Sequence, residues 1–546
     1  MRGRARVALA AAISALALVA SACGGGGGTT PGAGGSQNAG GGGGEISVRG
    51  CTPQNPLVAG NTAEVCGGNI LDVFTAKLMH YALKDATPEY DIAESIETED
   101  NINFTVKLKQ GYKFHDGTEV KAHNFVDAWN YTAYGKNGQQ GSYFFEPIEG
   151  YADVACADEE CSEEPKAKEL SGLKVVDDYT FTIKTSSPVS NLVVRLGYTA
   201  FAPQPDAFFD DPDSFKTKPI GAGPYQVDEV SDTQIVLSKF ADYSGEHEGK
   251  PDKITFRIYN DPSAAYNDVV SGNLDATDII PIDQMADDLY KSDLPDRTLV
   301  REQGVIQAIG FSPIDEQLKN PDLRKAISMA VDRELITKQI YNGSRIPADS
   351  FVSPVVNGYK QGACGEACTF DAAKAKALYD KAGGYKGTLT FGVNQDGGHK
   401  PMAEAVCNSL KNALGIDCAV EVTPDFKTLR DQLNRKERKG IFRQGWQMDY
   451  PNIENFLAPI YAKGASSNDV RYDNANFQEL IKKGNGATSP EEANKFYQEA
   501  EAQLVKDLPA FPTWFDAAVI GWSDRVTNVE TNAFGVIDYG QIEVLN

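Results

Sequence analysis

The stretch from residue 387 to residue 446 constrains the fold more than any other part of the chain. Strand-like alternation and helix-like apolar spacing follow each other there, at 387–394, 401–414, 417–423, 425–437 and 440–446. Successive β-α-β units place neighbouring strands parallel, with helices covering the faces of the sheet. The sequence therefore predicts an α/β fold built around a parallel sheet.

The loops after these three strands are the expected place for a ligand, because ligands of open parallel sheets bind outside the carboxyl ends of the strands. The loops carry His399, Phe426 and the segment from Trp446 to Asp449. An imidazole, a phenyl ring, an indole and a carboxylate are thus expected on one rim. In the alternative interpretation, Trp446 belongs to the core and Asp449 caps the following helix.

Other segments predict scaffold. Strands are expected at 103–108, 234–240 and 253–259, a hairpin at 172–185, a helix from about residue 122, and an extended crossover at 508–515. Residues 321–341 predict one long helix, because Asn320 suits the N-cap, Pro321 the first turn and Gly343 the end. None of these segments carries chemistry by itself.

The first 23 residues have the pattern of an export signal. Arginines precede an apolar run of signal-peptide length, and small residues precede Cys23. The stretch 20–23 resembles a bacterial lipoprotein box, with alanine where leucine or valine is usual. We expect residues 1–22 to be removed and Cys23 to be lipidated; ordinary cleavage that leaves a free cysteine is the alternative. Residues 23–44, mostly glycine, predict a flexible tether.

The remaining chain is long enough for about two to four domains and has no second apolar segment of membrane-spanning length. The formal net charge of −24 argues against nucleic acid and anionic lipid as direct partners. It says little about a ligand held in a cleft with its own local field.

The cysteines after Cys23 lie in four pairs that are close in sequence: Cys51/Cys66, Cys156/Cys161, Cys364/Cys368 and Cys407/Cys418. An even number of cysteines in an exported chain predicts disulfides. A metal site would need CxxC knuckles or clustered cysteine and histidine, and neither occurs among only five histidines. We expect four local disulfides and no metal.

The sequence has no catalytic signature. It lacks GxSxG, HExxH and Walker motifs. Its many carboxylates have no fixed geometry that would single out a glycosidase pair. We expect a protein that is not an enzyme and carries no cofactor, with a secreted hydrolase as the less favoured alternative.

Four segments occur in the same order as in a known family: 112–131, 219–227, 320–336 and 445–457. The last reads GW-x-x-DYP-x-x-x-NFL. Together they resemble the oligopeptide- and dipeptide-binding receptors of bacterial ABC importers, which are extracellular solute-binding proteins of family 5. The resemblance extends from about residue 51 to the C-terminus.

The resemblance implies a two-lobed α/β fold of the periplasmic-binding-protein type II class, with an additional domain in the first lobe. Lobe I would comprise residues 45–299 and 513–546, with the additional domain at about 84–197. Lobe II would comprise residues 300–512. The chain would cross between the lobes twice, which allows hinge closure over a ligand.

The resemblance also implies a function, namely capture of oligopeptides at the outer face of the cytoplasmic membrane by a lipid-anchored monomer and delivery to an ABC transporter permease. Asp449 matches the carboxylate that pairs with the α-ammonium group of the ligand. The other positions that match the ligand site, or lie near it, are Gly445, Trp446, Arg443, Phe426, His399, Asn69 and Tyr143.

Two departures from the family pattern leave ligand length and side-chain preference open. Gln447 and Met448 follow the tryptophan directly, and Gly67-Gly68 replaces bulkier polar residues. Relatives of the same fold bind oligosaccharides, opines, metal chelates or signalling peptides, so these ligand classes stay as alternatives. Asp449 favours a ligand that carries an amine.

Overall fold

The computed structural model describes residues 43–545, except positions 54, 63–64, 157–160, 396–397, 425 and 466 and the side chains of residues 282, 286, 426 and 427. The predicted signal peptide, Cys23 and nearly all of the glycine tether lie outside the described residues. Among the residues described, no helix combines the length and apolarity that membrane crossing requires.

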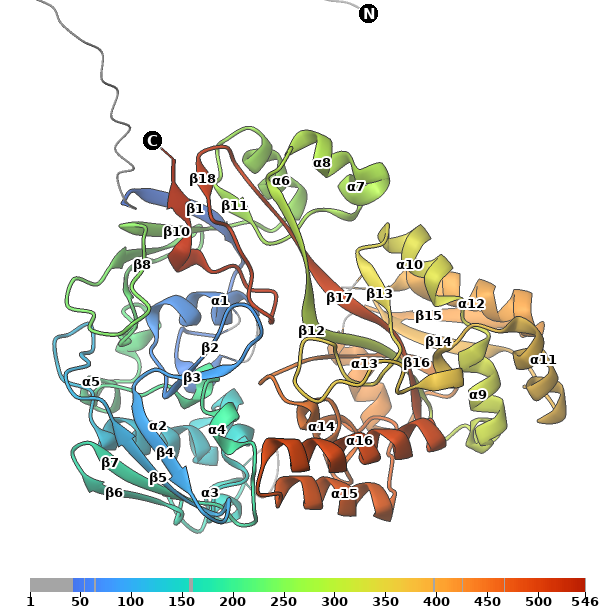
Figure 1. The fold of residues 1–546 in the computed structure, drawn as a ribbon, viewed down its shortest axis with the longest axis horizontal. Helices are drawn as coiled ribbons and strands as arrows, with labels where there is room; N and C mark the ends of the chain where they lie inside the picture. Colours follow the sequence, from blue (N-terminus) through green and yellow to red (C-terminus); the bar gives the residue numbers. More distant parts are fainter. Residues whose placement is uncertain are drawn as a thin grey trace, which may run out of the picture. The chain divides into compact units, whose positions relative to one another are not determined.

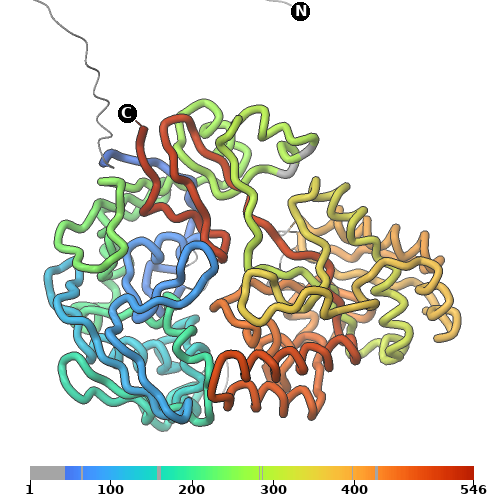
Figure 2. The backbone as a smooth tube through the Cα atoms, viewed as in Figure 1, coloured from blue at the N-terminus to red at the C-terminus, as the bar shows by residue number. Residues whose placement is uncertain are grey.

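One eleven-stranded sheet forms the centre of the fold, with the strand order β15-β14-β16-β12-β17-β11-β1-β10-β9-β8 and with β13 paired to β17. Two long antiparallel strands, β12 (Thr298–Phe311) and β17 (Ala510–Trp522), lie in the middle of this order. Figures 1 and 2 show these two strands running side by side as the chain passes from one half of the structure to the other and returns.

Each half of the sheet has its own hydrophobic core, and we call the surrounding parts of the chain lobe I and lobe II. The regular elements of lobe I are β1 (Glu45–Gly50), α1 (Val65–Phe74), β8 (Tyr225–Val230), β9 (Gln234–Lys239), β10 (Lys253–Ile258), α6 (Pro262–Val270), β11 (Ala276–Thr277), α7 (Ile282–Met285), α8 (Leu289–Asp293), β18 (Val526–Thr527) and β19 (Glu543–Val544). The strands predicted at 234–240 and 253–259 are confirmed as β9 and β10.

A separate four-stranded sheet, β4-β5-β7-β6, and most of a third core lie within residues 79–210, and we call this segment the additional domain; it is longer than the expected range of about 84–197. Its elements are β2 (Met79–Tyr81), β3 (Pro88–Tyr90), β4 (Ala93–Thr98), β5 (Asn103–Leu108), α2 (Ala122–Ala133), α3 (Tyr151–Val154), β6 (Leu173–Asp177), β7 (Thr180–Lys184), α4 (Leu192–Arg195) and α5 (Asp206–Asp210). The predicted strand at 103–108, the hairpin at 172–185 and the helix from residue 122 are confirmed.

Lobe II contains the β-α-β-α-β unit that the sequence predicts. The unit consists of β14 (Leu389–Asn394), α12 (Lys400–Leu414), β15 (Cys418–Thr423), α13 (Phe426–Asn434) and β16 (Ile441–Gln447). β14 lies between β15 and β16 and is parallel to both. The other side of β16 pairs with β12 in antiparallel orientation, so the parallel part of the sheet ends at β16.

The remaining elements of lobe II are α9 (Pro321–Met329), α10 (Arg333–Tyr341), β13 (Arg345–Pro347), α11 (Ala372–Lys381), α14 (Ala458–Tyr461), α15 (Ala475–Asn485) and α16 (Pro490–Asp507). The prediction of one helix over 321–341 was wrong, because the structure has two helices there. Asp332 interrupts the first helix by acting as the N-cap of the second, and its carboxylate accepts a hydrogen bond from the Leu335 N–H (3.0 Å). Asn342, in the left-handed region, ends α10 just before Gly343.

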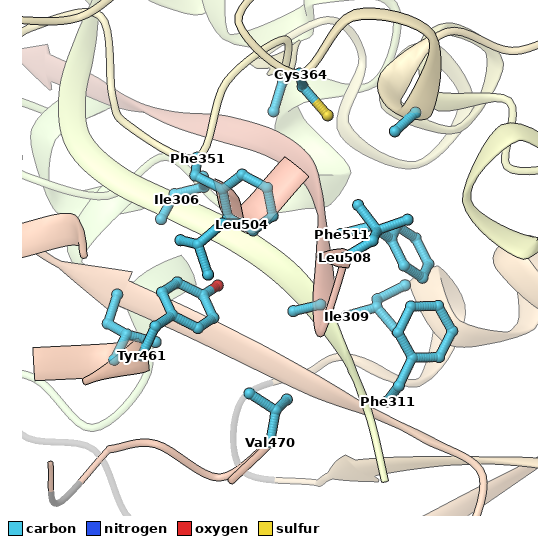
Figure 3. Packing of buried hydrophobic residues seen from close by; sticks show 14 of the residues in the cluster. Ile306, Ile309, Phe311, Phe351, Cys364, Tyr461, Val470, Leu504, Leu508 and Phe511 are labelled. Atoms are coloured by element: carbon cyan, nitrogen blue, oxygen red, sulfur yellow. The ribbon is translucent and has the colours of Figure 1, made fainter. Parts of the chain in front are cut away.

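The core of lobe II forms where the central strands meet the helices. Ile306, Ile309 and Phe311 of β12 lie close to Phe511 of β17 and Leu504 of α16 (Figure 3). All five side chains are almost completely buried. Each contributes about 1.5–3 kcal/mol to stability when it is fully removed from water. This packing holds the β12–β17 pair in place. The strand that leads to the candidate site, β16, pairs with β12.

Disulfides join the four predicted pairs, Cys51–Cys66, Cys156–Cys161, Cys364–Cys368 and Cys407–Cys418. The first connects the chain just after β1 with the start of α1. The last connects α12 with the start of β15. Each bridge closes a short loop, so it orders the chain locally rather than linking distant parts.

Candidate functional site

A cavity of about 1020 Å³ lies among lobe I, lobe II and the additional domain. Asn69 and Asp72 of α1 line it from lobe I, and Arg195 of α4 lines it from the additional domain. Lobe II contributes residues 443–450, which include the end of β16. The volume is at the upper end of the range of small-molecule sites, so the cavity suits a ligand of several linked groups.

The end of β16 places Trp446 and Asp449 in this cavity. Trp446 is the penultimate residue of the strand, and Asp449 follows two residues after the strand ends. Between them, Met448 is buried and donates its N–H to the carbonyl of Gly304 (2.8 Å), which holds the turn against the β12 side of the sheet. Asp449 lies in the loop at the carboxyl end of this strand, as predicted, whereas Trp446 was predicted in that loop and lies in the strand itself.

In the alternative interpretation, Asp449 caps the following helix and Trp446 belongs to the core. This is wrong for Asp449 and only partly correct for Trp446. The cap of the following 3₁₀ helix, Ile453–Phe456, is Asn452, whose side-chain oxygen accepts a hydrogen bond from the Glu454 N–H (2.9 Å). Trp446 packs against the core of lobe II but stays partly exposed and lines the cavity. Asp449 is therefore available for a role other than helix capping.

Asn455 connects Trp446 to Asp449. Its side-chain oxygen accepts hydrogen bonds from the Trp446 indole N–H (3.0 Å) and from the Asp449 backbone N–H (2.9 Å). Its side-chain nitrogen donates to Oδ2 of Asp449 (3.2 Å). Asn455 itself is 0% exposed, whereas Trp446 and Asp449 are half-buried, so the buried amide holds two side chains that reach the cavity.

Burial raises the pKa of Asp449 to about 6, and the hydrogen bond from Asn455 and the positive charge of Arg195 oppose this rise. In the described part of the chain, no lysine, arginine or histidine forms an ion pair with Asp449. The carboxylate is thus ionised above pH 6 while its charge has no close cationic partner. Such a group is suited to receive a cation from a ligand, because ligand binding would supply the missing charge.

Arg195 does not neutralise Asp449 because it pairs with Glu454. One guanidinium nitrogen of Arg195 donates to Oε2 of Glu454 (3.1 Å), and the guanidinium lies over the ring of Tyr450 (4.8 Å to the centroid). The same carboxylate oxygen accepts hydrogen bonds from Asn191 (2.8 Å) and from the hydroxyl of Tyr450 (2.7 Å). Two of these groups come from the additional domain and two from lobe II, so the cluster joins both walls beside Asp449.

Two further contacts connect the same two parts of the chain. The Ser190 N–H donates to the carbonyl of Asn485 at the end of α15 (2.8 Å), and the Asn101 side chain donates to the carbonyl of Ala487 (2.6 Å). The additional domain and lobe II are therefore in contact beside the cavity.

Arg443 lines the cavity from β16, and Gly445 makes room for it. A Cβ atom on residue 445 would lie 2.6 Å from a guanidinium nitrogen of Arg443 and 2.7 Å from the side-chain oxygen of Gln307. Both atoms are the ends of flexible side chains, so a side chain at position 445 would displace Arg443 and Gln307 from their present positions. Arg443 also contacts Gln307 directly, at 3.4 Å.

The other predicted residues have different locations. Asn69 is 8% exposed and lines the cavity from α1, whereas Tyr143 is 46% exposed and lines it from the additional domain, with its ring stacked on Phe144. His399 is half-buried at the start of α12 and is not among the described residues that line the cavity. Phe426 begins α13, but its side chain lies outside the described residues.

Residue-by-residue reasoning missed Arg195, Glu454 and Asn455. The first two are 259 positions apart, so no local pattern indicates that they pair. Asn455 stands in the quoted motif, six residues after Asp449, and its spacing there was the available signal.

The family model of bacterial extracellular solute-binding proteins, family 5 (middle region), matches residues 87–468. The dipeptide-binding protein DppE of Bacillus subtilis is 27% identical over 481 residues, which cover 83% of this chain and 84% of DppE. The oligopeptide-binding protein OppA of Bacillus subtilis is 24% identical over 466 residues, which cover 83% of each chain.

Solved structures show the same fold. The substrate-binding protein CtaP of Listeria monocytogenes superposes with a TM-score of 0.78 at 22% identity, covering 92% of this chain and 100% of CtaP. The murein tripeptide-binding protein MppA of Escherichia coli superposes with a TM-score of 0.75 at 21% identity, covering 92% of this chain and 98% of MppA. The predicted two-lobed α/β fold is confirmed, and because the family match spans well over half of the sequence, the chain belongs to family 5 of the bacterial extracellular solute-binding proteins.

Proposed function

We propose that the protein captures oligopeptides outside the cytoplasmic membrane and delivers them to an ABC transporter permease. The observation that carries this proposal is Asp449, a half-buried carboxylate with no ion-pair partner among the described residues, beside an indole in a large cavity. A peptide supplies both matching groups, because its α-ammonium neutralises the carboxylate and its first side chain packs on Trp446. The printed names of the relatives, dipeptide- and oligopeptide-binding proteins, agree with this ligand class.

The backbone of β16 supports the same ligand. The ladder between β14 and β16 comprises residues 441 and 442, whereas β12 pairs with β16 from residue 441 to residue 447. The edge of residues 444–447 that faces away from β12 is therefore not covered by β14. An extended peptide is able to add to such an edge through main-chain hydrogen bonds, which read the peptide backbone independently of its sequence.

The location and partners of the protein are part of the proposal. The export pattern of residues 1–22 and the box that ends at Cys23 support a lipid-anchored receptor at the outer face of the membrane. The family description, extracellular solute-binding proteins, agrees with this location. We infer that the protein acts as a monomer, that it releases its ligand unchanged to the permease, and that it is not an enzyme.

A binding experiment tests the ligand class. The full chain is incubated with a labelled mixture of tripeptides to pentapeptides and washed, and the retained molecules are identified by mass spectrometry. We expect intact peptides with free amino groups, and we expect the same mixture to be retained poorly after N-acetylation. Retention of acetylated and free peptides alike would refute Asp449 as the amine site, and recovery of fragments would indicate a hydrolase.

A further inference from the structure

The side chain of Asn455 uses both its oxygen and its nitrogen in hydrogen bonds to other residues of the cavity wall. It reaches back six residues to Asp449 and nine residues to Trp446 and makes three hydrogen bonds, all within 3.2 Å. An asparagine side chain has one acceptor atom and one donor group. Here the acceptor serves two N–H groups and the donor serves a carboxylate.

This pattern fixes the orientation of the amide. Two N–H donors, the indole of Trp446 and the backbone of Asp449, face the same atom of residue 455, so that atom is the oxygen. The nitrogen must then face Oδ2 of Asp449. A flipped amide would oppose donors to donors and would leave the carboxylate facing an oxygen. The orientation thus follows from the chemistry of the three neighbours.

The two residues that we assign to the ligand are therefore held by one amide. The indole ring is tied at its nitrogen, which leaves its carbon edge and faces for packing against the ligand. The carboxylate is tied at Oδ2, while no hydrogen bond to Oδ1 occurs among the described residues. Oδ1 is the oxygen that a ligand ammonium would meet.

From this arrangement we propose that Asn455 is a positioning residue that holds Trp446 and Asp449 in one fixed geometry for the amino end of the ligand. The proposal rests on the proposed function, because it assumes that Asp449 receives the ligand amine. It adds that the amide transmits the protonation state of Asp449 to the indole of Trp446. The amide N–H that reaches Oδ2 also favours the charged form of the carboxylate. In the described part of the chain, the other charged or titratable groups that act on Asp449 are Arg195, Glu454, Tyr81 and Tyr143.

The indole signal of Trp446 provides a ligand-free test. The chain has four tryptophans, and the variant Trp446→Phe identifies the signal of Trp446 in ¹H–¹⁵N spectra of the full chain. We expect this signal to shift with pH around a midpoint of about 6, the pKa of Asp449. Asp449→Asn should abolish the shift. A wild-type signal that does not respond to pH between 4 and 8 would overturn the proposal even if variants at position 455 fail to fold.

Two variants at position 455 separate positioning from packing. Asn455→Leu keeps the volume of the side chain and removes its hydrogen bonds, and Asn455→Ala removes both. We expect either variant to remove most of the pH-dependent shift at Trp446. Asn452→Ala is the matched control, because it removes the cap of the same 3₁₀ helix without touching Asp449, and it should keep the wild-type titration. An unchanged titration in Asn455→Leu would refute the positioning role.

Calorimetry with tri-alanine, free and N-acetylated, gives the second readout. In Asn455→Leu we expect the pH midpoint of binding of the free peptide to rise by roughly one pH unit, the effect of one lost charge-assisted hydrogen bond. An unchanged midpoint would contradict the proposal. If the acetylated peptide binds the wild type as tightly as the free one, the proposed amine site fails, and the ligand-free spectra still decide whether Asn455 couples the two residues.

Discussion

Replacing Asp449 with asparagine should stabilise the ligand-free protein and at the same time weaken its binding of peptides with a free amino group. The two shapes are nearly equal, and an asparagine oxygen still accepts the hydrogen bond that Asn455 donates to Oδ2. What changes is the charge. The carboxylate is half-buried in a cavity wall without an ion-pair partner among the described residues, and desolvation there is the first cause of its raised pKa.

The magnitude follows from the pKa. A carboxyl with a pKa of about 6 in the folded chain and 3.8 in the unfolded chain contributes stability that is fully present below pH 3.8 and is lost as pH rises through 6. At 1.36 kcal/mol per pH unit, the loss at pH 8 is up to about 3 kcal/mol. Asparagine does not ionise, so Asp449→Asn should match the wild type near pH 4 and exceed it by up to about 3 kcal/mol at pH 8.

Binding should change in the opposite direction. Deleting one partner of a desolvated charge pair costs about 2–5 kcal/mol, a loss of roughly 30-fold to several-thousand-fold in affinity. N-acetylation of the peptide removes the other partner of the same pair. Its effect on the wild type should therefore be similar, and the two effects should not add in the combined experiment.

The assay combines urea unfolding of both proteins at pH 4.5 and pH 8 with calorimetric titration of one peptide in its free and N-acetylated forms. A variant that is more stable at pH 8 and that no longer distinguishes the two peptides would agree with the argument. A variant that is no more stable than the wild type at pH 8 would refute the burial argument. An acetylated peptide that binds the wild type as tightly as the free peptide would refute the amine site.

Four further outcomes are expected. The affinity for a free-amine peptide should fall below pH 6, where Asp449 becomes protonated, and above about pH 8, where the peptide amine loses its charge; titrations at pH 5, 7 and 9 check this. Arg195→Met should lower the free energy of unfolding by about 3–5 kcal/mol, because it leaves the 3% exposed Glu454 without its ion-pair partner. X-ray scattering of the ligand-free variant should then show a larger radius of gyration, and an unchanged radius would contradict the idea that this cluster holds the two walls together. Thiol titration of the unfolded, unreduced protein should detect no thiol from the four bridged pairs, and two or more reactive thiols would contradict the disulfides. Cys23→Ser should release the protein from membranes, because it removes the residue that we expect to carry the acyl chains, and stable anchoring needs more than one chain. Complete retention of the variant in the membrane fraction would refute the anchor.

The sequence by itself determined those features that depend on neighbouring residues. The periods of apolar side chains over 387–446 predict the β-α-β-α-β unit, because each strand and helix buries one face that its own sequence defines. The disulfide pairs were readable for the same reason, since each bridge closes a short loop. Trp446 and Asp449 were found because a single strand end carries both.

Competition between local signals limits the prediction of helix boundaries from the sequence. The pattern over 321–341 contains a continuous apolar face, yet the chain there forms two helices. Asn320 and Pro321 begin α9, and Asp332, whose side chain also suits an N-cap, begins α10. Periodicity alone does not decide which of two possible starts the packed structure uses.

Only the tertiary structure decided how the cavity is completed. Arg195 and Glu454 meet because the additional domain docks on lobe II, and no period in the sequence encodes that contact. The same docking leaves Asp449 without an ion-pair partner among the described residues, since the nearby guanidinium pairs with Glu454 instead. His399 follows a strand of the same sheet but does not line the cavity. It is the N-cap of α12, so the packing of that helix decides where the imidazole lies. Local patterns select the elements, whereas charge balance and cavity lining arise from surfaces that meet only after those elements have packed.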